Sequence, residues 1–278
     1  MLIPRDFFAR PSVEVAPDLL GCVLEHETAD GLVAVELTEV EAYAGRSDPA
    51  SHAYRGKTQR NAVMFGPPGH AYVYFTYGMH FCVNMVCLGE QGSASAVLLR
   101  AGAIIAGEDL ARARRTRGPV SEGRARIPSR DLARGPARLC QALDIDRSLD
   151  GADVCVASSP LRVRAGAGNP ARSAKIVSGP RVGVSSAAEI PWRFWYDGDP
   201  TVSLYRAHVP RLRGVPGGSS PRGNTANWLP PDGVLVAPCR RGRHHRGTQL
   251  AGPDRRQYRS RRAAANAEIR PGDDLLRV

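Results

Sequence analysis

The chain has 278 residues and a formal net charge of +11. Residues 204–278 hold 15 arginines and five acidic residues, a net charge of +10, whereas residues 1–203 carry a net charge of only +1. Charge therefore excludes a uniformly basic domain over the first 203 residues, and a nucleic-acid function there must rest on local features.

The N-terminus, the apolar stretches and the cysteines exclude further classes of protein. The first residues carry Asp6 early and hold no long apolar run, so they do not predict a signal peptide. The apolar stretches are too short to span a bilayer. The six cysteines contain no CxxC pair, which indicates buried, reduced thiols in a cytoplasmic protein. His70 and His80 lie in separate contexts, and we predict no metal site.

The predicted elements are three short helices and seven β-branched or aromatic strands. The first helix is expected at residues 7–21, with Pro11 in its first turn and Gly21 at its end. Further helices are predicted at residues 104–115 and 136–143. Strands are predicted at residues 22–27, 32–37, 71–76, 81–86, 96–100, 180–185 and 192–195. Residues 48–61 and 117–130 are expected to be loops, and residues 66–69 a turn. This pattern predicts one α+β domain over residues 1–203, with a curved, mostly antiparallel sheet flanked by helices.

The composition changes at about residue 205. Downstream residues are rich in Gly, Pro and Arg and show no periodicity. They can bury too little apolar surface to offset the conformational entropy that their backbone would lose on folding. We therefore expect residues 204–278 to be a disordered tail. The tail is either an extension beyond the usual end of the domain or a basic arm that binds DNA, and composition favours the extension.

Glu41 is the first candidate for chemistry. It ends an apolar run and precedes Tyr43, and a partly desolvated carboxylate beside aromatic rings suits a general base. The alternative is that Glu36, Glu39 and Glu41 form the solvated face of an alternating strand, and the pattern alone favours that alternative.

Five other candidates are weaker when taken singly. A loop histidine such as His52 is more often a surface or structural residue. Tyr72 and Tyr74 suit core packing in a strand. An aromatic residue beside Gly78 at a hairpin tip, Tyr77, is placed to wedge between base pairs. Arg100 closes an apolar strand, and a buried arginine needs an anionic partner, whereas an exposed one is an ordinary surface cation.

Taken together, several blocks of the sequence resemble a known family. In chain order they are TEVEAY at 38–43, Asp48, SH at 51–52, RN at 60–61, YVYFTYGM at 72–79, Asn84, VLLR at 97–100, GP and LCQAL within 135–143, and SGPRVGV at 178–184. Over residues 3–203 the chain closely resembles the alkyladenine type of 3-methyladenine DNA glycosylase.

The resemblance implies an enzyme of base excision repair that flips a damaged purine out of duplex DNA and hydrolyses its N-glycosidic bond. It implies a cytoplasmic, nucleoid-associated monomer that binds double-stranded DNA containing damaged purines and needs no metal or organic cofactor. Candidate lesions are 3-methyladenine, 7-methylguanine, hypoxanthine and ethenoadenine.

The resemblance also implies roles for individual residues and reverses the preference for a solvated Glu41. Glu41 corresponds to the catalytic base, and Arg100 to the arginine that helps hold the water. The pocket and DNA residues it implies are Tyr43 as one wall of the base pocket, His52 and Tyr74 as the opposite wall, Asn84 as the residue that disfavours normal guanine, and Tyr77 as the residue that fills the gap in the duplex.

Two alternative functions remain. A catalytically inactive nucleic-acid-binding module on the same scaffold would not need Glu41 and Arg100 together. A glycosidase acting on free nucleosides would not need Tyr77 as a wedge. No lysine lies near the motif, so strand cleavage through a Schiff base is not expected.

Overall fold

The computed structural model describes residues 1–76, 78–89, 93–116, 126–166 and 175–207. The chain divides into two units, Met1–Gly214 and Val215–Val278, and only the first contains described residues. Residues 208–278 of the predicted tail, residues 117–125 of the predicted 117–130 loop and Tyr77 lie outside the described residues.

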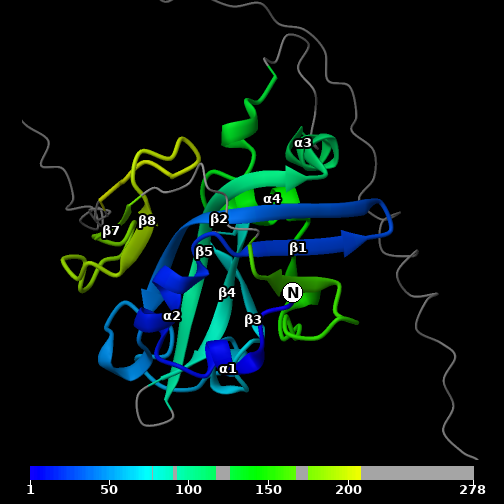
Figure 1. Ribbon diagram of the computed structural model, residues 1–278. Coiled ribbons are helices and arrows are strands. Elements are labelled where there is room, and N and C mark those ends of the chain that lie inside the picture. Colours follow the sequence, from blue (N-terminus) through cyan, green and yellow to red (C-terminus); the bar gives the residue numbers. More distant parts are fainter. Residues whose placement is uncertain (77, 90–92, 117–125, 167–174, 208–278) are drawn as a thin grey trace, which may run out of the picture. The chain divides into compact units, whose positions relative to one another are not determined.

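The described part is built on one antiparallel sheet of eight strands (Figure 1). The strands are β1 (Val23–Thr28), β2 (Gly31–Tyr43), β3 (Ala71–Thr76), β4 (His80–Leu88), β5 (Ala94–Ala106), β6 (Leu161–Arg164), β7 (Ile176–Gly179) and β8 (Arg193–Tyr196). The main order is β3-β4-β5-β2-β1-β6, while β8 pairs with the second half of β2 and β7 pairs with β8. In Figure 1 both long strands, β2 and β5, bend strongly along their length, so the sheet is curled as well as antiparallel. The predicted fold class is confirmed.

The helices are short and pack against the sheet. They are α1 (Arg5–Phe8), α2 (Ser12–Leu19), α3 (Glu108–Thr116) and α4 (Pro136–Leu143), with short 3-10 turns η1 (Gly45–Ser47), η2 (Ala62–Phe65), η4 (Ser129–Asp131) and η5 (Arg147–Leu149). Fully buried residues of α2 and α4, among them Val15, Leu19, Leu139 and Leu143, belong to one apolar core with the strands. Burial of this apolar surface is the main stabilising contribution to the fold. Among the described helices, none combines the length and apolar character needed to cross a membrane.

Several predicted elements differ from the observed ones. The helix expected at 7–21 is two helices, because the chain turns at Pro11, which precedes α2 in an extended conformation. Residues 104–106 continue β5 instead of starting a helix. Helix α3 begins only after Gly107, whose φ of +72° breaks the strand. Residues 180–185 form an irregular loop, not a strand, and this loop borders the site described next.

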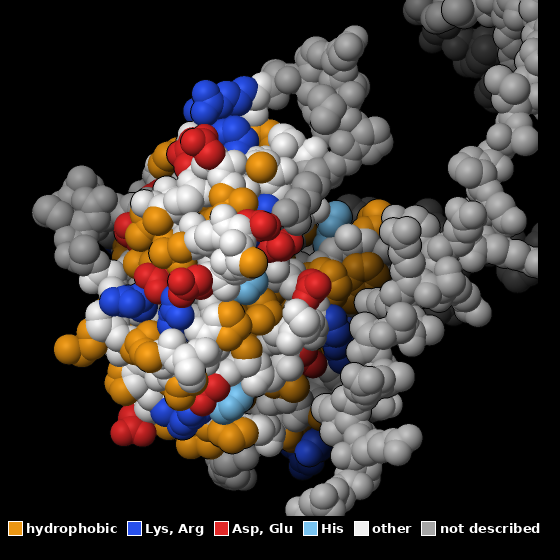
Figure 2. All heavy atoms as spheres, turned by 90° about the vertical axis from the view of Figure 1, so that its right-hand side faces the viewer, with side chains coloured by type: hydrophobic (Ala, Val, Ile, Leu, Met, Phe, Trp, Pro, Cys, Tyr) orange, Lys and Arg blue, Asp and Glu red, His pale blue; other side chains and the backbone are white. Residues whose placement is uncertain are grey.

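The surface of the described domain is mixed in charge. On the face shown in Figure 2, acidic and basic side chains alternate with apolar ones over short distances. This agrees with the net charge of +1 over residues 1–203.

Candidate active site

A pocket of about 540 Å³ opens on one face of the curled sheet. Side chains alternate along a strand, so every second residue of β3, β4 and β5 faces the same side. The register aligns Tyr72 with Asn84 and Asn84 with Leu98, and all three side chains line the pocket. Loop residues Pro49, Ala50 and His52, loop residues 182–185 and the first residues of α4 also line the pocket. Its volume lies within the range of small-molecule sites.

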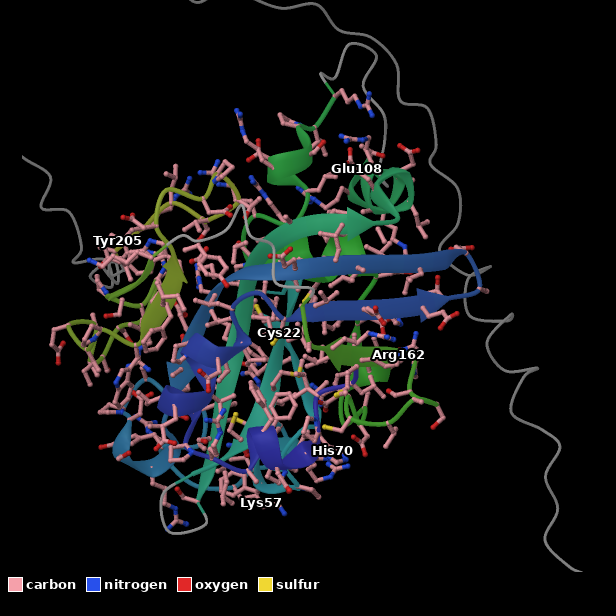
Figure 3. The ribbon with its side chains drawn as sticks, in the orientation of Figure 1. Cys22, Lys57, His70, Glu108, Arg162 and Tyr205 are labelled. Carbon is pink, nitrogen blue, oxygen red and sulfur yellow. The ribbon has the colours of Figure 1, made fainter. Side chains whose placement is uncertain are left out.

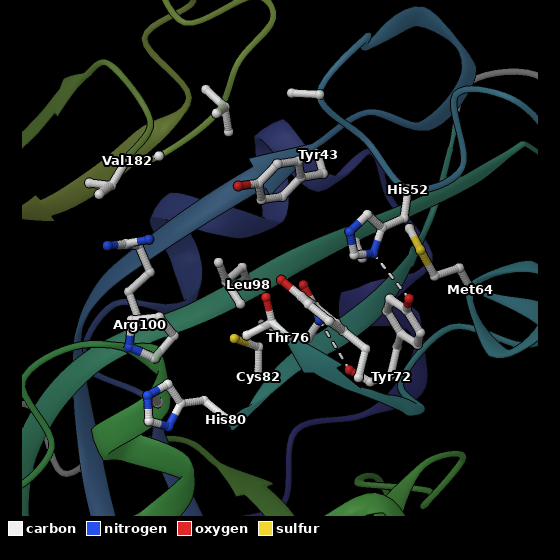
Figure 4. Close-up of a pocket in the computed structure, with 18 of the residues that line it drawn as sticks. Tyr43, His52, Met64, Tyr72, Thr76, His80, Cys82, Leu98, Arg100 and Val182 are labelled. Atoms are coloured by element: carbon white, nitrogen blue, oxygen red, sulfur yellow. Dashed lines mark hydrogen bonds between the residues drawn. The ribbon is translucent and has the colours of Figure 1, made fainter. Parts of the chain in front are cut away.

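The structure brings the predicted residues together. Tyr43, His52, Tyr74, Asn84 and Arg100 all line the pocket. Figure 4 shows Arg100 and Val182 on one side, His52, Tyr72 and Met64 on the other, and Tyr43 between them. Tyr77 lies outside the described residues, so its predicted role stays a prediction.

Glu41 is fully buried behind the pocket wall. Its Oε2 accepts a hydrogen bond from the Tyr43 hydroxyl (2.8 Å), and its Oε1 accepts one from the backbone N–H of Val182 (2.7 Å). Arg100 Nη1 forms an ion pair with the same Oε1 at 3.2 Å. A carboxylate oxygen has two lone pairs. Oε2, with one protein donor, therefore retains capacity for a water.

Glu39 forms a second buried charge pair next to Glu41. Its Oε1 accepts from Arg100 Nε (2.7 Å) and Arg193 Nε (2.8 Å), and Ser203 supplies its hydroxyl and its backbone N–H. The alternative that the alternating pattern alone favoured, a solvated strand face bearing Glu39 and Glu41, is wrong. Both carboxylates are fully buried, because two arginines from neighbouring strands neutralise them.

The charges set the protonation of this cluster. Burial acts to raise the pKa of Glu39, but the nearby charges of Arg100 and Arg193 outweigh it and hold that pKa below its usual value. Burial acts to lower the pKa of Arg100, and the two carboxylates Glu41 and Glu39 raise it above its usual value. Both residues are therefore ionised at neutral pH.

Three aromatic side chains form the other end of the pocket. The His52 ring lies edge-on to Tyr74 with centroids 4.6 Å apart, and Tyr72 stacks on Tyr74 at 5.5 Å. His52 Nδ1 and the Tyr72 hydroxyl share a hydrogen bond of 3.0 Å. Arg60 lies over the Tyr74 ring at 5.7 Å. Such a group presents flat, polarisable faces to a planar ligand.

Protonation at the aromatic end differs from that at the charged end. Burial, followed by the charge of Arg60, lowers the pKa of His52, which favours a neutral imidazole at pH 7. Burial raises the pKa of Tyr72 to about 12, so its hydroxyl keeps its proton. A neutral ring offers one N–H donor and one acceptor to the pocket and to Tyr72.

Tyr43 connects the two ends, and its position depends on a pair that the sequence reasoning did not assign. Its hydroxyl bonds Glu41, while its ring lies 4.8 Å from the Arg181 guanidinium carbon. Arg181 is buried and forms a bidentate ion pair with the buried Asp48, at 2.6 and 2.9 Å. Asp48 and Arg181 both lie within the recognised sequence blocks, which was the only signal for this pair.

Asn84 is buried, and its side-chain nitrogen donates to the Tyr72 carbonyl at 3.0 Å. This bond crosses from β4 to β3 and fixes the orientation of the amide in the pocket wall. A fixed amide can select among bases by their edge groups, which suits the predicted role of Asn84.

Two further residues of the charged cluster, Arg193 and Ser203, were also not predicted from the sequence. They lie 154 and 164 positions from Glu39 in the sequence, and no local pattern marks them. Within the described ranges, no group of three or more His, Cys, Asp or Glu side chains is placed to hold a metal ion. The five cysteines of those ranges, Cys22, Cys82, Cys87, Cys140 and Cys155, are free thiols.

The arrangement therefore joins the Glu41 carboxylate, held against Arg100, to a pocket lined with aromatic rings. The carboxylate can polarise a water, and the rings can hold a flat heterocycle beside it.

Comparisons with known proteins point to the same chemistry. The sequence model of a family described as methylpurine-DNA glycosylase matches residues 6–200. A relative from Streptomyces avermitilis is 57% identical over 213 residues, covering 76% of this chain and 95% of the relative. A relative from Leifsonia xyli subsp. xyli is 52% identical over 208 residues, covering 73% of this chain and 92% of the relative. Both carry the name "Putative 3-methyladenine DNA glycosylase".

Proposed function

The chain belongs to the methylpurine-DNA glycosylase family, and from that premise we propose that it is a monofunctional enzyme that extrudes alkylated or deaminated purines from duplex DNA before it hydrolyses their N-glycosidic bond. Family membership itself makes the chain a DNA glycosylase, a hydrolase of N-glycosyl bonds that acts in repair of damaged DNA. The proposal concerns how the base is reached, which residues act, and which bases are released.

The observation that carries the proposal is the buried pair of Glu41 and Arg100 at the wall of the aromatic pocket. Burial of a carboxylate and a guanidinium costs several kcal/mol per ion before their attraction is counted. A module that only bound DNA would gain nothing from this pair at the end of a base-sized pocket. The pair therefore favours an active enzyme over the inactive binding module.

In the proposed reaction Glu41 accepts a proton from a water bound near its Oε2. The water oxygen attacks the anomeric carbon of the sugar, and the electrons of the broken C–N bond leave with the purine. Alkylation at N3 or N7 makes the purine cationic, so it departs as a neutral base. Hypoxanthine is a neutral lesion, so it also needs a proton as it leaves, and it should depend more on the enzyme.

The aromatic end would hold the extruded base. Tyr43 lies on one side of the pocket and His52 on the other, with Tyr74 beside it, and rings of this kind hold cationic heterocycles well. Extrusion costs about a few kcal/mol of stacking and pairing. Tyr77, which lies outside the described residues, is proposed to offset part of that cost by stacking in the gap. Asn84 is proposed to disfavour normal guanine.

The position of the lysines supports the proposed hydrolysis without strand cleavage. The chain contains only two lysines, Lys57 and Lys175, and neither lines the pocket. A Schiff base with the sugar would need an amine within reach of the anomeric carbon.

The test is the variant Glu41→Gln, assayed by single-turnover release of hypoxanthine from a duplex. The amide keeps the shape of the side chain but cannot take the proton, so the rate should fall by at least about 100-fold while binding of the duplex stays nearly intact. Glu25→Gln is a matched control, because Glu25 also faces arginines, Arg162 and Arg164, but lies outside the pocket lining. Release by Glu41→Gln within a few-fold of wild type would remove Glu41 from the role of base.

A second test offers free inosine to the wild-type protein. We expect no release from the nucleoside, because the proposed enzyme draws its binding energy from the duplex. Equal rates on inosine and on hypoxanthine DNA would favour the nucleoside glycosidase.

A further inference from the structure

Residues 199–206 form a segment that reaches the charged end of the pocket from outside the sheet. Figure 3 labels Tyr205, two residues beyond Ser203, on the side of the molecule where β7 and β8 lie. The segment is tied down along its length. Arg134 Nε donates to the Val202 carbonyl (2.8 Å), and the backbone N–H of Gly183 donates to the Arg206 carbonyl (3.3 Å). It therefore contacts both the catalytic cluster and the pocket loop.

Ser203 is the residue of this segment that enters the cluster, and all three of its polar groups are used. Its backbone N–H donates to Glu39 Oε2 at 2.6 Å, and its carbonyl accepts from Arg193 Nη2 at 2.7 Å. Its hydroxyl donates to Glu39 Oε1 at 2.8 Å and accepts from Arg100 Nη2 at 3.3 Å. A hydroxyl has one proton and two lone pairs, so both bonds can exist at once.

These contacts assign each nitrogen of the Arg100 side chain to a different partner. Nε binds Glu39, Nη2 binds Ser203, and Nη1 faces Glu41. A guanidinium is planar and rigid, so anchoring two of its nitrogens fixes the direction of the third. The Ser203 hydroxyl supplies one of those anchors and also holds the carboxylate that supplies the other.

We propose that Ser203 is a positioning residue for base release, which orients Arg100 toward Glu41 and the attacking water. The inference rests on the proposed function of Glu41 and Arg100, and Ser203 itself touches neither the water nor the base. Without the hydroxyl, Arg100 keeps its charge and its bond to Glu39 but loses the second anchor of its plane. Misplacement of a catalytic group by a fraction of an ångström is enough to slow a reaction strongly.

The test compares Ser203→Ala with Ser203→Thr. The first variant removes the hydroxyl, and the second keeps it. We expect the single-turnover rate of hypoxanthine release to fall about tenfold in Ser203→Ala and to stay near wild type in Ser203→Thr. Affinity for a duplex containing a tetrahydrofuran abasic analogue should be unchanged in both, because this analogue has no base to release and its binding does not depend on how Arg100 is oriented toward the attacking water.

Thr201→Val is the matched control for local loosening. Thr201 lies two residues earlier in the same segment, is buried, and bonds Thr38 and Asp199 instead of the cluster. We expect this variant to lower thermal stability at least as much as Ser203→Ala while it retains the wild-type rate.

Three results would overturn the proposal. They are an unchanged rate in Ser203→Ala, an equal loss of rate in Thr201→Val, or an equal loss in Ser203→Ala and Ser203→Thr. The wild-type protein, assayed beside the variants, distinguishes failure of the positioning role from failure of the proposed function. If wild type releases no base while Glu41→Gln matches it, the function itself is wrong. If wild type is active and Ser203→Ala equals it, only the positioning role is wrong.

Discussion

The two ends of the pocket are held by contacts of different kinds. At the charged end, Glu39, Glu41, Arg100 and Arg193 are nearly or fully buried, and each is bonded to at least one other member. At the aromatic end, His52, Tyr72 and Tyr74 contact one another mainly through ring faces and edges, with one hydrogen bond among them.

This difference predicts how each end responds to change. Removal of one partner from a buried ion pair leaves an uncompensated charge and costs about 3–5 kcal/mol. Loss of one aromatic contact costs about 0.5–1.5 kcal/mol in addition to the free energy lost with the buried apolar area. The charged end should therefore fail as a unit, whereas the aromatic end should weaken in steps.

The largest effect on folding is expected where the two kinds of contact meet, at Tyr43. Its ring lies on Arg181, whose only carboxylate partner among the described residues is Asp48. Asp48→Asn keeps the shape but removes the charge, so the free energy of unfolding should fall by about 3 kcal/mol. Chemical denaturation followed by circular dichroism measures this loss.

Asp18→Asn is the control for this prediction, because it removes a carboxylate from an exposed pair with Arg10. An exposed pair contributes at most about 1 kcal/mol, so this variant should be nearly neutral. Similar small losses in both variants would show that the Arg181–Asp48 pair does not hold the wall at Tyr43.

A smaller effect is expected from Tyr77→Ala, which tests the aromatic side of the comparison in the DNA complex. Loss of one stacking aromatic should slow release from a duplex by about tenfold. A lesion in single-stranded DNA should be affected much less, since no gap has to be filled. The measurement is single-turnover release on both substrates.

Phe75→Ala supplies the control on the same hairpin. Phe75 is an exposed aromatic that packs on Phe81, with ring centroids 4.9 Å apart. Equal losses for Tyr77→Ala on duplex and single-stranded substrates, or a loss on duplex matched by Phe75→Ala, would make Tyr77 a packing residue.

The sequence predicted the local elements around the pocket better than the contacts of its charged end, for a physical reason. Strand β3 and helix α4 were placed at their observed limits, because their patterns of apolar residues and their Gly or Pro boundaries are local. The pocket roles of Tyr74 and Asn84 came from the family resemblance, and strand alternation accounts for their shared face only once the β3–β4 register is known. The register itself is a long-range property, but the hairpin turn at Gly78 brings it within reach of the sequence.

The charged end depends on contacts that no local pattern contains. Glu39 and Glu41 look like a solvated strand face, and only the arginines of β5 and β8 make their burial possible. The bulge in β2 between Leu37 and Val40 further disturbs the alternation that the sequence reasoning assumed. The family resemblance assigned Glu41 and Arg100, but it assigned nothing to Glu39, Arg193 or Ser203.

The smallest effect is expected from truncation after His208, which removes a net charge of +9 but keeps Ser203 and Arg206. Both ends of the pocket are then complete, so the folded state and the single-turnover rate should equal those of the full chain. Affinity for undamaged DNA at low salt should fall, and its dependence on salt should become shallower, because fewer counterions are released on binding.

Truncation after Val202 is the matched comparison, since it shortens the chain by only six more residues and removes Ser203. The shorter protein loses three hydrogen bonds to the buried Glu39 and Arg100, so its charged end should no longer be held and its rate should drop sharply. Equal, full rates in both truncations would show that the charged end holds itself without Ser203 and the rest of the segment after Val202. A large drop in rate already in the protein truncated after His208 would place part of the catalytic domain in the tail.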